Sequence, residues 1–165
     1  DDLGTDDVPI DFKRMIHRIH ASGLTGVPYG VCGFGNSTHV YDVTYPGALN
    51  NCEGCHEPPD ERNNIYPYHP AEAGTILGTT IDVGADVASP TDDVVISPNS
   101  AVCSSCHVSD LAKTHMEQNG GNFAATKNPD GSLNPADVES CALCHGPGRS
   151  ADVSEVHGVA DFQFN

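Results

Sequence analysis

Three short motifs place two cysteines and a histidine at one fixed spacing. They are Cys52-Glu53-Gly54-Cys55-His56, Cys103-Ser104-Ser105-Cys106-His107 and Cys141-Ala142-Leu143-Cys144-His145. Each follows the pattern C-x-x-C-H, which attaches c-type haem. Two thiols separated by two residues on a tight helical turn can each add across one haem vinyl group, and the next histidine then points at the iron. The sequence therefore predicts three covalently attached c-type haems (heme c), with His56, His107 and His145 as proximal iron ligands.

Three other uses of paired cysteines fit the sequence less well. Zinc sites combine two C-x-x-C units or one unit with distant histidines, whereas here a histidine directly follows the second cysteine in every copy. A thioredoxin-like redox pair requires a βαβ setting, and a disulfide framework would not require three identical spacings that end in histidine. The seventh cysteine, Cys32, lies outside the motifs. It is interpreted either as a small unreactive thiol or as a disulfide partner for a neighbouring copy.

Six further histidines are available as second axial ligands. They are His17, His20, His39, His69, His115 and His157. Three irons need at most three more ligands, and each of the two methionines lies close to an available histidine, so we expect bis-histidine ligation. Histidine in place of methionine lowers the haem potential. An iron with two histidines has no open axial position, which favours electron transfer over substrate activation.

One helix is expected to carry two of these histidines. The segment Asp11–His20 has Asp11 as a candidate N-cap and apolar residues at helical spacing. His17 and His20 lie three residues apart on one side of this helix. They cannot approach one iron from opposite faces, so as ligands they would serve two different haems.

Further short elements are predicted nearer the other motifs. A second helix is expected over Ser109–Gln118, with His115 facing a haem and Asn119-Gly120-Gly121 ending the helix. A third helix is expected to begin after Asn134-Pro135 and to run into the last motif. The stretch from Gly74 to Pro98 is rich in β-branched residues with a central glycine, which favours short extended pieces or a small hairpin.

The composition is typical of a domain built around covalent cofactors. Apolar residues make up 38% of the chain and tryptophan is absent, so the side chains alone would form a thin core. Seventeen glycines and twelve prolines interrupt the chain often. We therefore expect a single domain over residues 1–165 that is mostly irregular, has a few short α-helices, is organised around covalently bound haems, and has a short flexible N-terminus over residues 1–8.

The charge and hydropathy exclude several partners. A formal net charge of −16 argues against nucleic acid and against an anionic membrane surface. No stretch approaches the roughly 20 apolar residues that a transmembrane helix needs. The first residues, DDLGTDDVPI, lack the basic and apolar regions of a signal peptide. We expect an exported chain, extracellular or at the cell surface, whose targeting segment has been removed.

The order and flanks of the motifs resemble those of a known family. The segments DFKRMIHRIH, GFGNSTHVYDVTYPGALNNCEGCH, ISPNSAVCSSCH, KTHMEQNGG and ESCALCHGPGR, with a late Val156-His157, are similar to the haem domains of outer-membrane decahaem cytochromes of metal-reducing bacteria, the OmcA/MtrC type. The likeness covers Val8 to Val159. It implies closely packed bis-histidine haems that pass electrons to minerals, soluble shuttles or partner cytochromes. It also implies five distal ligands, His17, His20, His39, His115 and His157, and leaves His69 as a surface residue.

The chain departs from that family in its number of motifs. A family haem domain carries five haems, whereas this sequence has three motifs and therefore two surplus histidines. The chain is then a fragment, or the surplus histidines are idle, or they reach haems of a neighbouring copy. The last option would build a head-to-tail homopolymer, a filament whose haems form a continuous wire.

The sequence supports three classes of function. The first is an extracellular electron carrier without an enzymatic reaction of its own. The alternative is a multihaem reductase with one substrate-accessible haem, which would need an open axial position. The third is a structural filament in which haem chiefly stabilises a thin core.

Overall fold

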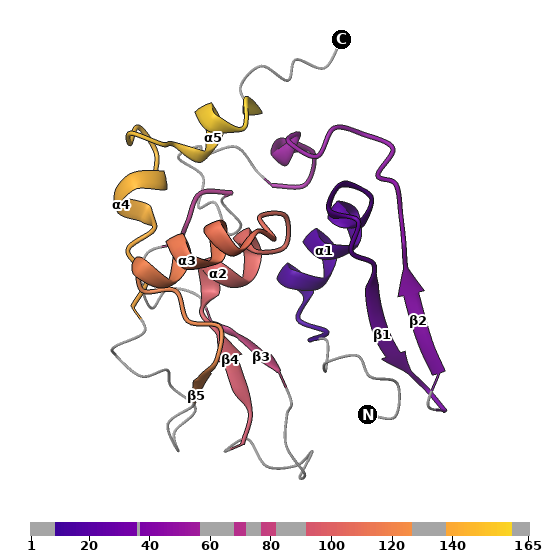
Figure 1. The fold of residues 1–165 in the computed structure, drawn as a ribbon. Coiled ribbons are helices and arrows are strands. Elements are labelled where there is room, and N and C mark those ends of the chain that lie inside the picture. The colour runs from indigo at the N-terminus through magenta and orange to yellow at the C-terminus, as the bar shows by residue number, and fades with distance from the viewer. Residues whose placement is uncertain are drawn as a thin grey trace.

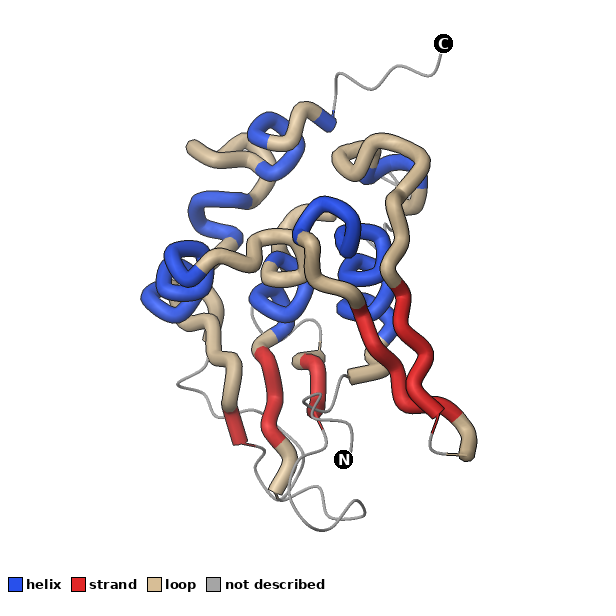
Figure 2. The backbone as a smooth tube through the Cα atoms, turned by 45° about the vertical axis from the view of Figure 1, so that its right-hand side comes forward, coloured by secondary structure: helices blue, strands red, loops and turns tan. Residues whose placement is uncertain are grey.

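The computed structural model describes residues 9–35, 37–56, 68–71, 77–81, 92–126 and 138–159. The helices gather in one half of the molecule, and two small sheets extend from the same side of it (Figures 1 and 2). The helical elements are α1 (Phe12–Thr25), the 3-10 turn η1 (Cys52–Gly54), α2 (Pro98–Cys103), α3 (Asp110–Gln118), α4 (Ala142–His145) and α5 (Val153–Val156). Each C-x-x-C-H motif therefore overlaps a helical element: the first η1, the second the end of α2, and the third α4.

The ends of α1 explain why this segment is helical. Oδ1 of Asp11 accepts hydrogen bonds from the backbone N–H groups of Lys13 and Arg14, which satisfies two of the donors at the start of the helix. Gly26 ends the helix in the left-handed conformation, with a φ of 67°. The predicted helix and its Asp11 cap are confirmed, and the helix continues past His20 to Thr25.

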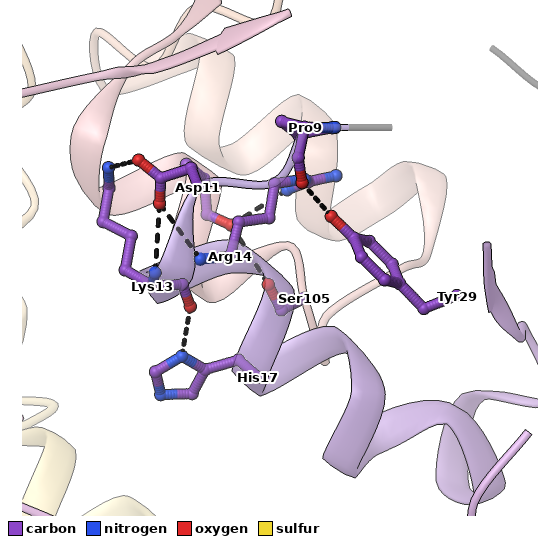
Figure 3. Close-up of polar contacts among 8 residues, drawn as sticks. Pro9, Asp11, Lys13, Arg14, His17, Tyr29 and Ser105 are labelled. Atoms are coloured by element: carbon purple, nitrogen blue, oxygen red, sulfur yellow. Dashed lines mark hydrogen bonds and ion pairs between the residues drawn. The ribbon is translucent and has the colours of Figure 1, made fainter. Parts of the chain in front are cut away.

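A hairpin that the sequence analysis did not predict packs beside α1. Strands β1 (Tyr29–Gly33) and β2 (Ser37–Tyr41) are antiparallel, with Tyr29 opposite Tyr41. Tyr29 is 2% exposed, and its hydroxyl donates to the Pro9 carbonyl (Figure 3). Cys32 belongs to β1, and nothing beyond its backbone pairing is described. The predicted flexible N-terminus, residues 1–8, lies outside the described residues.

The second sheet has the strand order β3-β4-β5. It consists of β3 (Thr79–Ile81), β4 (Val94–Ile96) and β5 (Ala125–Thr126), each antiparallel to its neighbour. The antiparallel pairing of β3 with β4 confirms the short extended pieces or small hairpin predicted between Gly74 and Pro98. Val95, Ile96 and Ala125 are almost fully buried and form the centre of the small core.

The second predicted helix is confirmed and the third is wrong. Helix α3 begins after its N-cap Ser109 and ends at the C-cap Asn119. In contrast, residues 138–140 are not helical, and α4 begins only at Ala142. Residues 134–137 lie outside the described part. The reason is tertiary, because Ser140 N–H donates to the Asn119 carbonyl at 2.9 Å instead of continuing a helix.

The described core is thin, as its composition predicts. Eight apolar residues are buried, and only five of them are larger than alanine: Tyr29, Val95, Ile96, Met116 and Val159. Within the described residues no helix is both long and apolar enough to cross a membrane.

Candidate haem-binding site

The three motifs adopt the same backbone turn. In each one the N–H of the second cysteine donates to the carbonyl of the first cysteine at 3.1–3.2 Å, and the N–H of the histidine donates to the same carbonyl at 2.8–2.9 Å. None of the six motif cysteines forms a disulfide, and the first of each motif is partly buried while the second is exposed. Residues three and four apart share one face of a helical turn, so both thiols and the histidine lie toward the same side.

Each motif histidine faces one histidine from elsewhere in the chain. The ring centroids are 5.9 Å apart for His17 and His56, 5.9 Å for His107 and His157, and 6.1 Å for His115 and His145. The partners come from α1, from the residue that ends α5, and from α3. Three segments far apart in sequence thus each bring one imidazole to one motif.

The spacing of these ring pairs fits one metal ion between two imidazoles. A first-row metal ion binds an imidazole nitrogen at about 2.0 Å, and the ring centre lies about 1 Å beyond that nitrogen, so two rings on opposite sides of one ion have centroids about 6 Å apart. The same spacing recurs in all three pairs. The residues present therefore fit a haem iron with two axial histidines at each motif.

Hydrogen bonds to the backbone orient one ring of each pair. The Nδ1 atoms of His17, His145 and His157 lie within hydrogen-bonding distance of the carbonyls of Lys13, Ala151 and Val153, respectively (Figure 3 for His17). When Nδ1–H donates to a carbonyl, Nε2 carries the lone pair and is the nitrogen left to bind a metal. Metal-binding histidines commonly have this second hydrogen bond.

The surroundings lower the pKa of two of the paired histidines. Burial lowers the pKa of His17 below its ordinary value; the hydrogen bond to the Lys13 carbonyl opposes this shift, and the charges of His56 and His20 add to it. Burial also lowers the pKa of His107, and the charges of His157 and His145 act in the same direction. A neutral imidazole is the form that binds a metal ion.

Exposed apolar side chains flank the ring pairs. Val108 follows His107 directly, Leu111 lies one turn before His115, Leu143 lies between the cysteines of the third motif, and Val156 precedes His157. These four residues are 47%, 81%, 70% and 58% exposed, respectively. An apolar macrocycle held between the paired rings would cover such side chains, since burial of apolar surface is favourable.

Cysteines of different motifs influence one another's pKa values. Burial raises the pKa of Cys103 to about 12, and the nearby Cys141 contributes in the same direction. Burial likewise raises the pKa of Cys52, with a contribution from Cys106. The second motif therefore interacts electrostatically with both the first and the third.

A buried carboxylate links the second motif to the third. Glu139, two residues before Cys141, is 7% exposed. Its oxygens accept from the hydroxyls of Ser97 and Ser100 at 2.8 and 2.7 Å, and from the backbone N–H groups of Asn99 and Ser100 at 2.7 Å. These donors belong to the start of α2, where a negative charge is favourable. The side chain that leads into the third motif thus caps the helix that carries the second.

His69 is not the surface residue that the resemblance implied. Its side chain is 7% exposed, and its Nε2 lies 2.9 Å from Oδ1 of Asp152, which is equally buried. The Ser154 hydroxyl, the Gly148 N–H and His69 together hold the pKa of Asp152 below its ordinary value. This pair fixes the start of α5, which ends next to His157. The sequence signal was weak because His69 and Asp152 are far apart in the chain.

Two of the five distal candidates lie outside the ring pairs. His20 contacts Tyr45, with ring centroids 4.7 Å apart. His39 is exposed on β2, and its Nε2 is 3.4 Å from the Ser37 hydroxyl. Among the described residues, no motif histidine faces the ring of His20 or His39.

The comparison with known families decides the class of protein. The family model described as "Outer membrane cytochrome MtrC/MtrF-like, domains II/IV" matches residues 2–158. The chain belongs to this family. Its members are multihaem outer-membrane cytochromes involved in electron transfer, so the resemblance seen in the motifs is confirmed. No curated protein and no solved structure matched the chain.

Proposed function

We propose that this MtrC/MtrF-like domain carries three covalently bound c-type haems, each with two axial histidines from the same chain, and that it transfers electrons outside the cell. The observation that carries the proposal is the spacing of about 6 Å between the rings of three histidine pairs, each of which includes one motif histidine. When bound, the haem irons supply one-electron chemistry between the ferric and ferrous states.

The residues of the chain have distinct roles in this proposal. Cys52, Cys55, Cys103, Cys106, Cys141 and Cys144 form the thioether bonds. The axial pairs are His17 with His56, His107 with His157, and His115 with His145. The carbonyls that accept from Nδ1 fix the ring orientation and raise the basicity of the ligand.

The order of the three sites follows from the contacts between the motifs. The second motif is close to the first through α1, whose His17 faces His56 and whose Arg14 donates to the Ser104 hydroxyl, and it is close to the third through Glu139. We therefore place the second haem in the middle of a chain of three, with the first and third as its ends. The acceptors would be other multihaem cytochromes, minerals or soluble shuttles, as the resemblance implied.

Neither the reductase nor the filament is needed to explain the ligands. A reductase requires one iron with an open axial position, whereas each of the three motif histidines has a partner ring. A filament with ligands that cross between copies would use the two surplus rings, His20 and His39. The present proposal gives both axial ligands of every iron to one chain and leaves these rings outside.

The experiment is to express the chain with a haem-maturation system and measure its haem content, spin state and potentials. We expect an intact mass with three haems, low-spin spectra without a high-spin fraction, and no binding of carbon monoxide or nitrite. His17→Met should raise one of the three potentials, because methionine ligation raises haem potentials, and His20→Met should change none of them. A high-spin, ligand-binding haem in the native protein would favour the reductase.

A further inference from the structure

One short segment of the chain orients histidines of two different sites. It runs from the connection after α4 into the start of α5 (Figure 1). The Ala151 carbonyl lies 2.9 Å from Nδ1 of His145, the histidine of the third motif. The Val153 carbonyl lies 3.0 Å from Nδ1 of His157, whose ring faces the second motif. The two carbonyls that orient these rings therefore flank a single residue, Asp152.

The side chain of Asp152 is buried and hydrogen-bonded on both oxygens. The residue is 5% exposed. Its Oδ1 accepts from the backbone N–H and the hydroxyl of Ser154 at 2.8 and 2.7 Å, and its Oδ2 accepts from the Gly148 N–H at 2.5 Å. Nε2 of His69, from a distant part of the chain, lies 2.9 Å from Oδ1. Donors on both oxygens stabilise the ionised carboxylate, so a negative charge is held at this point.

One peptide unit connects this carboxylate to the histidine that faces the second motif. The N–H of Ser154 and the carbonyl of Val153 belong to the same planar unit, in which the two groups point in opposite directions. The N–H donates to Asp152, and the carbonyl faces Nδ1 of His157. Hydrogen bonds in such a chain strengthen one another, so the charge on Asp152 makes the Val153 carbonyl a stronger acceptor.

A second peptide unit leads from Asp152 to the third motif. Its N–H belongs to Asp152 and donates to the Arg149 carbonyl at 3.2 Å, and its carbonyl is that of Ala151. The Ala151 N–H donates to the Cys144 carbonyl at 3.0 Å. The contact of the carboxylate with the Gly148 N–H closes the same turn. The acceptor for the histidine of the third motif is thus held in a turn that the Asp152 side chain closes.

We propose that Asp152 is a positioning residue for two haems: through the carbonyls on either side of it, Asp152 sets the hydrogen bonds on Nδ1 of His145 and His157 and lowers the potentials of the third and second haems together. This inference rests on the proposed function, because it requires haems at both motifs. A stronger hydrogen bond on Nδ1–H makes Nε2 more basic, and a more basic ligand favours ferric iron. The buried negative charge acts in the same direction, since ferric iron carries one more positive charge than ferrous iron.

The test compares two variants of the haem-loaded protein in which asparagine replaces aspartate. Asp152→Asn keeps an oxygen that can cap α5 but removes the charge. Asp110→Asn is the matched control, because Asp110 is exposed at the start of α3, five residues before His115. Asp152 has the same separation from His157.

The readouts are the haem count by intact mass and a potentiometric titration followed by electron paramagnetic resonance. The titration assigns the potentials, because the rings of the first pair lie 29° from parallel and those of the other two pairs 74° and 88°, so their signals differ. We expect three haems in both variants. Only Asp152→Asn should raise the second and third potentials, and it should change the first potential less.

The outcomes separate the inference from the proposed function. Fewer than three haems in the wild-type protein would contradict the proposed function itself. Three haems with unchanged potentials in Asp152→Asn, or equal shifts of all three potentials, would overturn the role of Asp152. If Asp152→Asn does not mature, Ser154→Ala replaces it, because this variant keeps the carboxylate but removes the hydroxyl donor at 2.7 Å. With one donor fewer the negative charge is less neutralised, so the second and third potentials should fall more than the first. Unchanged potentials in Ser154→Ala would then contradict the proposal.

Discussion

The first histidine pair and the other two pairs are built differently. The rings of His17 and His56 lie 29° from parallel, whereas the rings of the second and third pairs are 74° and 88° apart. His17 is positioned by α1, a helix with its own caps at both ends. The second and third pairs depend on buried polar links, above all Glu139 and Asp152. The capped helix α1 is thus sufficient to present His17, whereas His145 and His157 lie on short helices whose positions depend on Glu139 and Asp152.

Removing one pair of motif cysteines should cause the largest loss of haem and stability, and the loss of stability should depend on which motif is changed. Cys103→Ala with Cys106→Ala should lower the intact mass by one haem and lower the stability toward denaturant substantially. The second motif contacts α1 through Arg14 and the third motif through Glu139, so its haem covers the junction of both regions. Cys52→Ala with Cys55→Ala should also remove one haem but destabilise less. Equal losses of stability would contradict the central position of the second motif.

Removing the buried carboxylate of Glu139 should lower the free energy of unfolding far more than removing the exposed carboxylate of Glu117. Glu139→Ala leaves the donors at the start of α2 unsatisfied, and we expect a loss on the order of 3–5 kcal/mol in the free energy of unfolding. Glu117→Ala removes a carboxylate whose side chain is 48% exposed, and should change stability by about 0.5 kcal/mol or less. Denaturant titrations followed by far-UV circular dichroism measure both. A Glu139 variant as stable as the Glu117 variant would show that the two C-terminal motifs are not linked in this way.

Two glycines provide a matched comparison between the regions. Gly26 and Gly120 both have positive φ, 67° and 86°, so alanine at either position costs about 1–2 kcal/mol. A Cβ at Gly26 would meet open space, whereas a Cβ at Gly120 would overlap the Val138 carbonyl. We therefore expect Gly120→Ala to cost about 2 kcal/mol more than Gly26→Ala, measured by the same titrations. Similar losses would mean that the crossing of residues 119–121 with residues 138–140 is loose.

Electron paramagnetic resonance should reveal the smallest difference, that between the ring angles. Nearly parallel imidazoles split the two iron orbitals that interact with the ring π systems, whereas perpendicular imidazoles leave them close in energy. The ferric protein should therefore give one rhombic low-spin signal from the first haem and two strongly anisotropic signals from the others. Three rhombic signals would contradict the described ring orientations.

The sequence predicted local helices well, but it predicted only in part how segments far apart in the chain pack together. The Asp11 cap and a helix beginning near Ser109 could be recognised because the start of a helix depends on a few neighbouring residues. The predicted helix after Pro135 failed because the chain there pairs with the end of α3, a contact between residues far apart in sequence. The β1–β2 hairpin was missed because its glycine-rich segment has no clear alternation of apolar and polar residues.

The same limit applies to the site. The motif cysteines and histidines follow from spacing alone. The choice of His17 over His20 as the partner of a motif histidine follows from the direction in which α1 packs, and the sequence does not fix that direction. The buried contact between His69 and Asp152 likewise depends on the folding of the whole C-terminal half.

A crystal structure of the haem-loaded protein tests the central claim most directly, because it shows which histidine nitrogen meets each iron. We predict three six-coordinate irons, each between two histidines of one chain: His17 with His56, His107 with His157, and His115 with His145. An iron bound by His20 or His39, or by a histidine of a neighbouring copy, would contradict the account.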